Sequence, residues 1–172
     1  MNNALTDDTR LAMRGAFASA ALFVALIVVF SAAGAKGPPT GVFLLMGGVL
    51  GVFSHLVLLP VVAALPAPAW ARATGYAWIT IDVMLNVGTV NGADVGLVAA
   101  LRLGGHVSAA TWMALAAWHM PGLVRGIGIP LAALLLIHAF ASPWLPAWAI
   151  FIPFFLLPVW LALVGRYLLS RP

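Results

Sequence analysis

The sequence predicts an all-α integral membrane protein, a bundle of six transmembrane helices with the N- and C-termini in the cytoplasm. Of its 172 residues, 64% are hydrophobic and only 7% are charged, and the mean hydropathy is +1.11. Globular chains carry about 25% charged residues, so this chain has too few to cover a soluble surface. Its long apolar runs also differ from the ~10-residue alternating strands of a membrane barrel. Helices are then the remaining structure that pairs all backbone N–H and C=O groups in lipid.

Glycine and proline divide the chain into six predicted helices within one domain, residues 1–172. The predicted helices cover residues 10–34, 41–65, 74–91, 94–120, 123–141 and 147–169. Thr6 and Asp7 suit the start of the first helix. Its Ala12, Ala16 and Ala20 form a row of small residues that lets another helix approach closely.

Turn signals separate the later helices. Residues 36–40, 66–68, 91–92, 121–122 and 142–146 hold the Pro, Gly, Asn and Ser clusters typical of turns. Pro60 is expected to bend the end of the second helix, where Gly47, Gly51 and His55 share one face. Four tryptophans fit the belts that mark membrane–water interfaces: Trp70, Trp78, Trp144 and Trp148.

The distribution of charge decides whether residues 94–120 cross the membrane. With six spans and a cytoplasmic N-terminus, only Lys36 lies in an outside loop. The arginines in loops and tails then lie inside: Arg10, Arg14, Arg72, Arg125, Arg166 and Arg171. Five spans would move Arg125, Arg166 and Arg171 outside. The positive-inside rule therefore favours six spans, and we expect the inner (cytoplasmic) membrane of a bacterium.

The sequence lacks the patterns that are typical of several classes of function. The basic residues are scattered singly, which argues against nucleic-acid binding. The absence of cysteine removes disulfides and thiolate sites. No H-E-x-x-H, G-x-S-x-G or phosphate-cradling motif is present. An enzyme acting on a lipid or quinone stays open as an alternative, but nothing in the sequence is specific for it.

Residues 78–92 carry an unusual group of polar side chains within an apolar run. At about 100° per residue, Asp82, Asn86 and Thr89 fall within about 60° of one another on a helix, and Asn91 follows them. A carboxylate in a membrane helix is costly unless it faces protein, water or a ligand. This stripe is therefore the main candidate site.

The neighbouring helix has a matching polar face. Counted at 1.5 Å per residue from the shared turn, Asn86 and Arg102 both lie roughly 10 Å deep, and Asp82 and His106 about 15 Å. An Asp–Arg or Asp–His pair would offset much of the cost of burying either charge. The pair is either a structural link between the helices or part of a cavity for a ligand or proton.

Three further histidines have weaker cases. His55 lies at mid-depth and is a candidate for the same cavity, whereas His138 and His119 are expected at interfaces. Haem b held by paired imidazoles is an alternative. His106 and His119, however, point about 140° apart, and His55 and His138 fall at different depths in this topology.

The leading hypothesis is a small-solute or proton-coupled transporter, or its substrate-binding membrane subunit, rather than an enzyme. The candidate ligand- or proton-binding residues are His55, Asp82, Asn86, Thr89, Asn91, Arg102 and His106. No metal or cofactor is predicted. Besides membrane lipid, a second copy or a partner membrane protein is expected to dock through Ala12, Ala16 and Ala20 or through Gly47 and Gly51.

Overall fold

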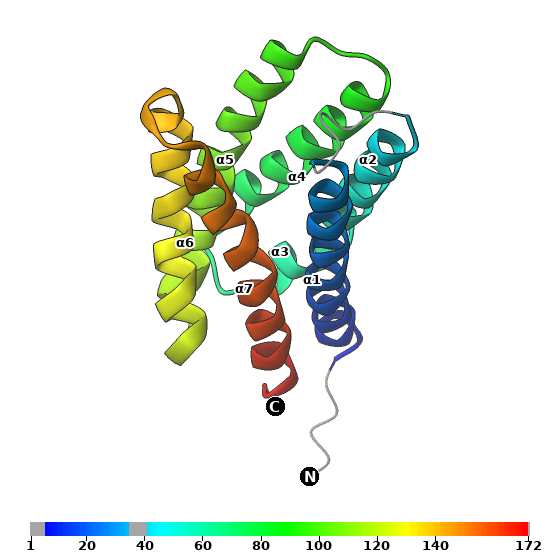
Figure 1. Ribbon diagram of the computed structural model, residues 1–172. Coiled ribbons are helices and arrows are strands. Elements are labelled where there is room, and N and C mark those ends of the chain that lie inside the picture. The colour runs from blue at the N-terminus through cyan, green and yellow to red at the C-terminus, as the bar shows by residue number, and fades with distance from the viewer. Residues whose placement is uncertain (1–5, 35–40, 172) are drawn as a thin grey trace.

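The computed structural model describes residues 6–34 and 41–171, and in this part of the chain all regular structure is helical (Figure 1). Six long helices form the molecule, with one short helix and two 3₁₀ turns between them. Their bounds are α1 (Asp7–Gly34), α2 (Gly41–Leu56), α3 (Leu59–Ala64), α4 (Ala69–Val90), α5 (Val95–Trp118), α6 (Gly122–Ala141), η1 (Ser142–Trp144), η2 (Ala147–Ile150) and α7 (Phe151–Leu169).

The six predicted long helices are present, with three shifted starts. The first begins at Asp7 rather than at residue 10. The third begins at Ala69 rather than at residue 74, because the chain turns helical directly after the extended residue Pro68. The last begins at Phe151 rather than at residue 147. The four residues before it form the tighter 3₁₀ turn η2.

The predicted bend at Pro60 is a complete break between α2 and α3. Proline has no N–H, and its ring crowds the carbonyl four residues earlier. At the break the Leu58 N–H donates to His55 O at 3.0 Å, so the Ser54 carbonyl loses its helical donor. Ser19 on α1 supplies another, its Oγ donating to Ser54 O at 2.7 Å. A side chain of the neighbouring helix α1 thus replaces the hydrogen bond that the break removes.

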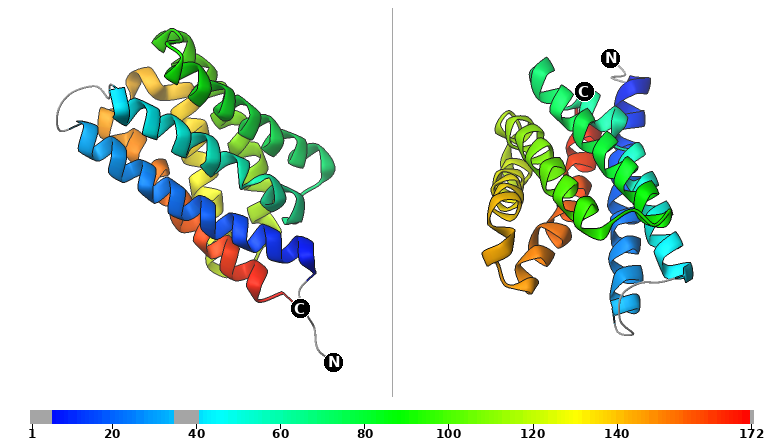
Figure 2. Two further views of the ribbon diagram at one scale, coloured as in Figure 1. Left: turned by 90° about the vertical axis from the view of Figure 1, so that its right-hand side faces the viewer. Right: turned by 90° about the horizontal axis from the view of Figure 1, so that it is seen from above.

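The long helices form a closed ring. Each packs on the next one along the chain, and α7 packs on both α6 and α1. The left view of Figure 2 shows α1 lying between α2 and α7. The first residues of α1 and the last of α7 lie at one end of the ring, which we call the termini end (Figure 1). We call the opposite end the far end.

Four helical segments are long and apolar enough to cross a membrane: Asp7–Ala33, Gly41–Ala64, Gly122–Trp144 and Phe151–Leu169. The two long helices outside this set are α4 and α5. These two carry Asp82, Asn86, Arg102 and His106. Their lower hydropathy thus comes partly from the side chains of the predicted site.

Tryptophans fill part of the interior. The ring centroids of Trp78 and Trp112 lie 6.0 Å apart, and those of Trp112 and Trp160 lie 5.8 Å apart. Trp78 is only 3% exposed, so its expected place at a membrane interface is wrong. Trp70, Trp144 and Trp148 are exposed. Of this group, Trp78 alone faces inward.

A matched pair of substitutions tests this core. Trp160 Nε1 donates to Val124 O at 3.1 Å, whereas the buried Trp112 Nε1 has no acceptor among the described residues. Trp160→Phe should therefore destabilise the protein by about 1 kcal/mol more than Trp112→Phe, since only the first removes a buried hydrogen bond. Thermal unfolding in detergent measures the difference. Equal losses would contradict the assigned hydrogen bond.

The small-residue faces expected to dock a partner are filled inside the chain. Ala12, Ala16 and Ala20 are buried. A Cβ added at Gly47 would lie 3.2 Å from the Phe30 ring, and one at Gly51 would lie 2.5 Å from Asn86 Oδ1. The close approach predicted from these residues occurs between helices of one chain.

Candidate functional site

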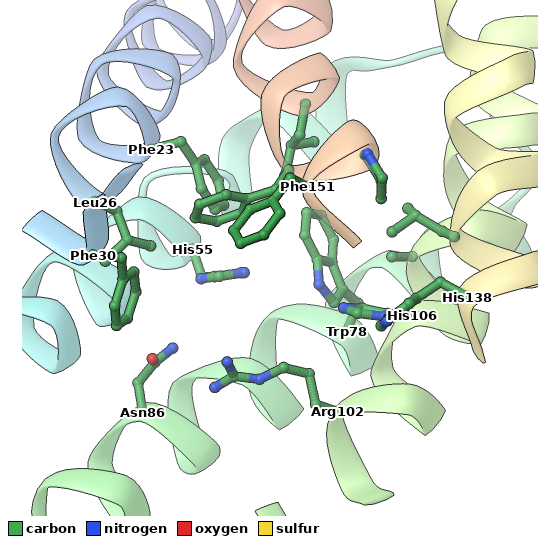
Figure 3. A pocket seen from close by; sticks show the side chains of 15 residues that line it. Phe23, Leu26, Phe30, His55, Trp78, Asn86, Arg102, His106, His138 and Phe151 are labelled. Atoms are coloured by element: carbon green, nitrogen blue, oxygen red, sulfur yellow. The ribbon is translucent and has the colours of Figure 1, made fainter. Parts of the chain in front are cut away.

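A cavity of about 250 Å³ lies inside the ring, in the half nearer the far end (Figure 3). All six long helices contribute to its wall. The lining residues are Phe23, Leu26, Phe30, His55, Trp78, Asn86, Arg102, His106, Ala109, Leu135, His138, Phe151, Pro153, Phe154 and Leu157. Phe30 and Phe151, at its edge, are exposed. The wall is thus mainly apolar, and its polar groups come from α2, α4, α5 and α6.

Asp82 is the centre of the charged cluster. Its Oδ1 lies 3.6 Å from Arg102 Nε, so the two faces matched by depth do meet. Its Oδ2 lies 3.4 Å from His55 Nε2. The second partner is therefore His55 from α2, and not His106 as the depth count allowed. The ring places α2 against α4, and a depth count on two helices cannot include that third helix.

The Asp82 carboxylate lies behind the cavity wall rather than in it. The residue is 5% exposed and is not among those that line the cavity, whereas its partners His55 and Arg102 are. A bound molecule would therefore touch the histidine and the arginine. Asp82 would act on it through these two side chains, by setting their charge and orientation.

Short contacts on every side fix the His55 ring. Its Nδ1 lies 2.7 Å from Gly51 O and 3.3 Å from Ser54 Oγ. Phe23 and Trp78 meet it edge to face, with ring centroids 5.3 and 5.2 Å away. These contacts hold the ring so that Nε2 points at Asp82.

A pair of histidines lines another part of the cavity. His106 on α5 and His138 on α6 approach with their Nδ1 atoms 3.1 Å apart, so one ring donates and the other accepts. His138 is 6% exposed, which corrects its expected interfacial position. His55 and His138 were also expected at different depths, yet both line this cavity.

The other predicted polar residues are divided. Asn86 lines the cavity, and its Nδ2 donates to Asp82 O at 2.7 Å. Thr89 and Asn91 do not line it; they donate to backbone carbonyls one turn earlier, Leu85 O at 2.7 Å and Val87 O at 2.8 Å. The polar stripe of α4 therefore reaches the cavity only at its deeper end. Thr89 and Asn91 instead form their hydrogen bonds within the same stretch of chain.

In the described parts of the chain, no three His, Cys, Asp or Glu side chains are grouped so that they could hold a metal ion. The haem alternative needs two imidazoles on opposite sides of an iron. His106 and His138 instead bond directly to each other. His119 lies exposed at the end of α5, with Nδ1 2.7 Å from Leu115 O. This arrangement gives the haem hypothesis no support.

Comparison of the chain with protein-family models, with curated proteins and with solved structures found no match. The site is therefore interpreted from its own residues.

Proposed function

We propose that this chain is a six-span membrane protein of the bacterial inner membrane that binds a small solute in the cavity and carries it across together with a proton. The observation that supports this most is the cavity itself. Side chains from six helices surround it, its wall is mostly apolar, and its few polar groups converge. Binding sites for small molecules have this composition.

The six-span part of the proposal rests on where the polar side chains of α4 and α5 point. Asp82 is buried, and Asn86, Arg102 and His106 line the cavity. Hydropathy alone therefore underestimates how well these helices suit lipid. A cytoplasmic termini end agrees with the positive-inside rule, because α1 begins and α7 ends there, close to Arg10, Arg14, Arg166 and Arg171.

Proton coupling rests on the histidines. His55 touches the Asp82 carboxylate, and His106 and His138 touch each other. Each contact holds a hydrogen between two groups that exchange protons readily. Buried ionisable residues in membrane helices commonly mark the paths of ions and protons. The proposal therefore assigns the proton to these two contacts and the solute to the space between them.

Cysteine labelling tests access to the cavity. The chain has no cysteine, so a single introduced thiol is the only reactive one. Leu135 lines the cavity, and its neighbour Leu136 is exposed on another face of α6. In oriented vesicles, a charged, membrane-impermeant thiosulfonate should label Leu135→Cys from the far end and, more slowly, from the termini end. Leu136→Cys should stay unlabelled, because a thiol in lipid is not ionised.

Each result decides part of the proposal. If Leu135→Cys reacts no faster than Leu136→Cys, water does not reach the cavity and the binding function is wrong. If Leu135→Cys reacts from the far end only, the cavity binds without alternating access, and the transport part is wrong.

A further inference from the structure

We propose that the solute is a small organic monoanion, such as an aromatic or short-chain carboxylate, which Arg102 binds head-on while His55 and Asp82 share a proton. This inference rests on the proposed function and specifies its substrate class. Three features carry it: the unused donors of Arg102, the hydrogen that the His55 contacts require, and the apolar wall.

Arg102 has hydrogen-bond donors without acceptors. Its Nε lies 3.6 Å from the Asp82 carboxylate, beyond hydrogen-bond distance, and is buried without a partner. None of its other nitrogens donates a hydrogen bond to a described residue. Figure 3 shows the guanidinium pointing toward Asn86 and His55 at the cavity wall. A planar fork of donors in this position matches a carboxylate, which accepts two parallel hydrogen bonds from it.

The contacts of His55 require one more hydrogen than a neutral ring and a carboxylate supply. Gly51 O is only an acceptor, so the Nδ1 that lies 2.7 Å from it carries a hydrogen. The Ser54 hydroxyl also donates to Gly51 O, at 2.9 Å. A neutral ring would then turn the lone pair of Nε2 toward Asp82 Oδ2, at 3.4 Å. Two lone pairs repel, so a proton lies between these atoms, on one or the other.

The cluster with this proton carries one net positive charge. The Asp82 carboxylate contributes one negative charge, and the Arg102 guanidinium and the shared proton contribute one positive charge each. With His106 and His138 counted as neutral rings, whose Nδ1 atoms lie 3.1 Å apart, this second pair adds no charge. The cavity residues of α1 and α7 are Phe, Leu and Pro only. One bound anion therefore neutralises the charge of the site. This neutralisation matters most in an apolar environment, where an unpaired charge is costly to bury.

The wall defines the rest of the molecule. Phe23, Phe154 and Leu157 are among the aromatic and aliphatic side chains that surround the polar groups. The volume, about 250 Å³, is below the ~300–1,000 Å³ typical of drug-sized ligands. The ligand is therefore smaller than a drug, with an apolar body and a single charged end.

The test uses 4-bromobenzoate and its neutral analogue 4-bromobenzamide with the full chain in nanodiscs. The bromine quenches tryptophan fluorescence at close range, and Trp78 is the tryptophan among the cavity-lining residues. The part of the quenching that disappears in Trp78→Phe reports on the cavity. We expect 4-bromobenzoate to bind at least tenfold more tightly than 4-bromobenzamide.

Variants separate the role of charge from that of folding. Arg102→Gln should weaken 4-bromobenzoate about 10- to 100-fold, the range for losing a charged hydrogen bond, and leave 4-bromobenzamide unchanged. Arg102→Lys keeps the charge without the fork and should cause a smaller loss. Arg125→Gln is the matched control, because Arg125 is exposed and stacks on Trp118 rather than lining the cavity. It should leave both affinities unchanged.

The pH dependence tests the shared proton. Within the pH range where 4-bromobenzoate is ionised, its binding should be strongest at the acidic end, where the proton is in place. Once pH is high enough to remove it, affinity should fall about tenfold per pH unit, because one proton then binds with each anion. His55→Gln should abolish this slope. A slope that His55→Gln leaves unchanged would contradict the assignment of the proton to His55 and Asp82.

The outcomes separate this inference from the proposed function. Equal, Trp78-dependent binding of both probes would overturn the anion assignment while leaving a solute-binding cavity in place. The same conclusion follows if Arg102→Gln and Arg102→Lys both bind 4-bromobenzoate normally. If neither probe quenches Trp78 although Leu135→Cys is labelled from both sides, the anion assignment is wrong and the transport proposal stands.

Discussion

Asp82→Asn is expected to destabilise the protein by about 3 kcal/mol, the lower end of the range for breaking a buried ion pair. The substitution leaves the Arg102 guanidinium without its counter-charge, and it removes the negative charge that His55 Nε2 faces. The side chain of Arg102 is 39% exposed, so water in the cavity reduces the loss. Thermal unfolding in detergent measures it.

A double-mutant cycle identifies the partner. Combining Asp82→Asn with Arg102→Gln should recover much of the stability, because no uncompensated charge remains, with a coupling of about 0.5–3 kcal/mol. Asp82→Asn should combine additively with Arg125→Gln, which lies outside the site. His106→Gln should couple to His138→Gln. If Asp82 couples to neither Arg102 nor His55, the cluster is wrongly assigned.

The same cycle separates a structural role from a functional one. The variant that carries Asp82→Asn and Arg102→Gln should fold, and yet it should not bind 4-bromobenzoate. Recovery of both stability and binding would mean that the ion pair only joins α4 to α5.

Gly15→Leu is expected to prevent correct assembly, with a loss larger than the about 1–3 kcal/mol typical of overpacking. Gly15 is buried where α1 crosses the break between α2 and α3, and a Cβ there would overlap the Val57 carbonyl oxygen. A backbone oxygen cannot move aside as a flexible side chain does. Unfolding temperature and the monodisperse fraction after size-exclusion chromatography measure the effect.

Ala18→Leu is the control for this change. It places the same side chain on α1 at an exposed position, where surface substitutions usually change stability by less than about 0.5 kcal/mol. If both leucine variants behave alike, α1 does not approach the break at Gly15.

The close passage of α1 over this break also concerns the site. Ser54 and His55 lie in the last turn of α2, and the Ser19 hydroxyl donates a hydrogen bond to the Ser54 carbonyl. The orientation of His55 toward Asp82 thus depends on a helix that carries no charged residue near the cavity. Substitutions at Gly15 should therefore weaken binding of the anionic probe even where some protein folds.

Local chemistry in the sequence determined the helical class, the six long helices and the meeting of the polar faces of α4 and α5. Apolar length and the lack of charge require helices in lipid, and proline and glycine mark where they end. Asp82–Arg102 was one of two contacts predicted from the short turn that joins α4 to α5, the other being Asp82–His106. The turn brings the polar faces of the two helices together at similar depth, and burial forces their charges to pair.

Only the tertiary structure decided which other residues contact Asp82 or line the same cavity. His55 comes from α2 and His138 from α6, and closure of the ring brings both to one cavity. The sequence also could not tell that Trp78 faces inward or that Ala12, Ala16 and Ala20 pack within the chain. The physical reason is that lipid is as apolar as the protein interior. The rotation of an apolar helix about its axis is then set by close packing with its neighbours, and its own hydrophobic pattern does not encode it.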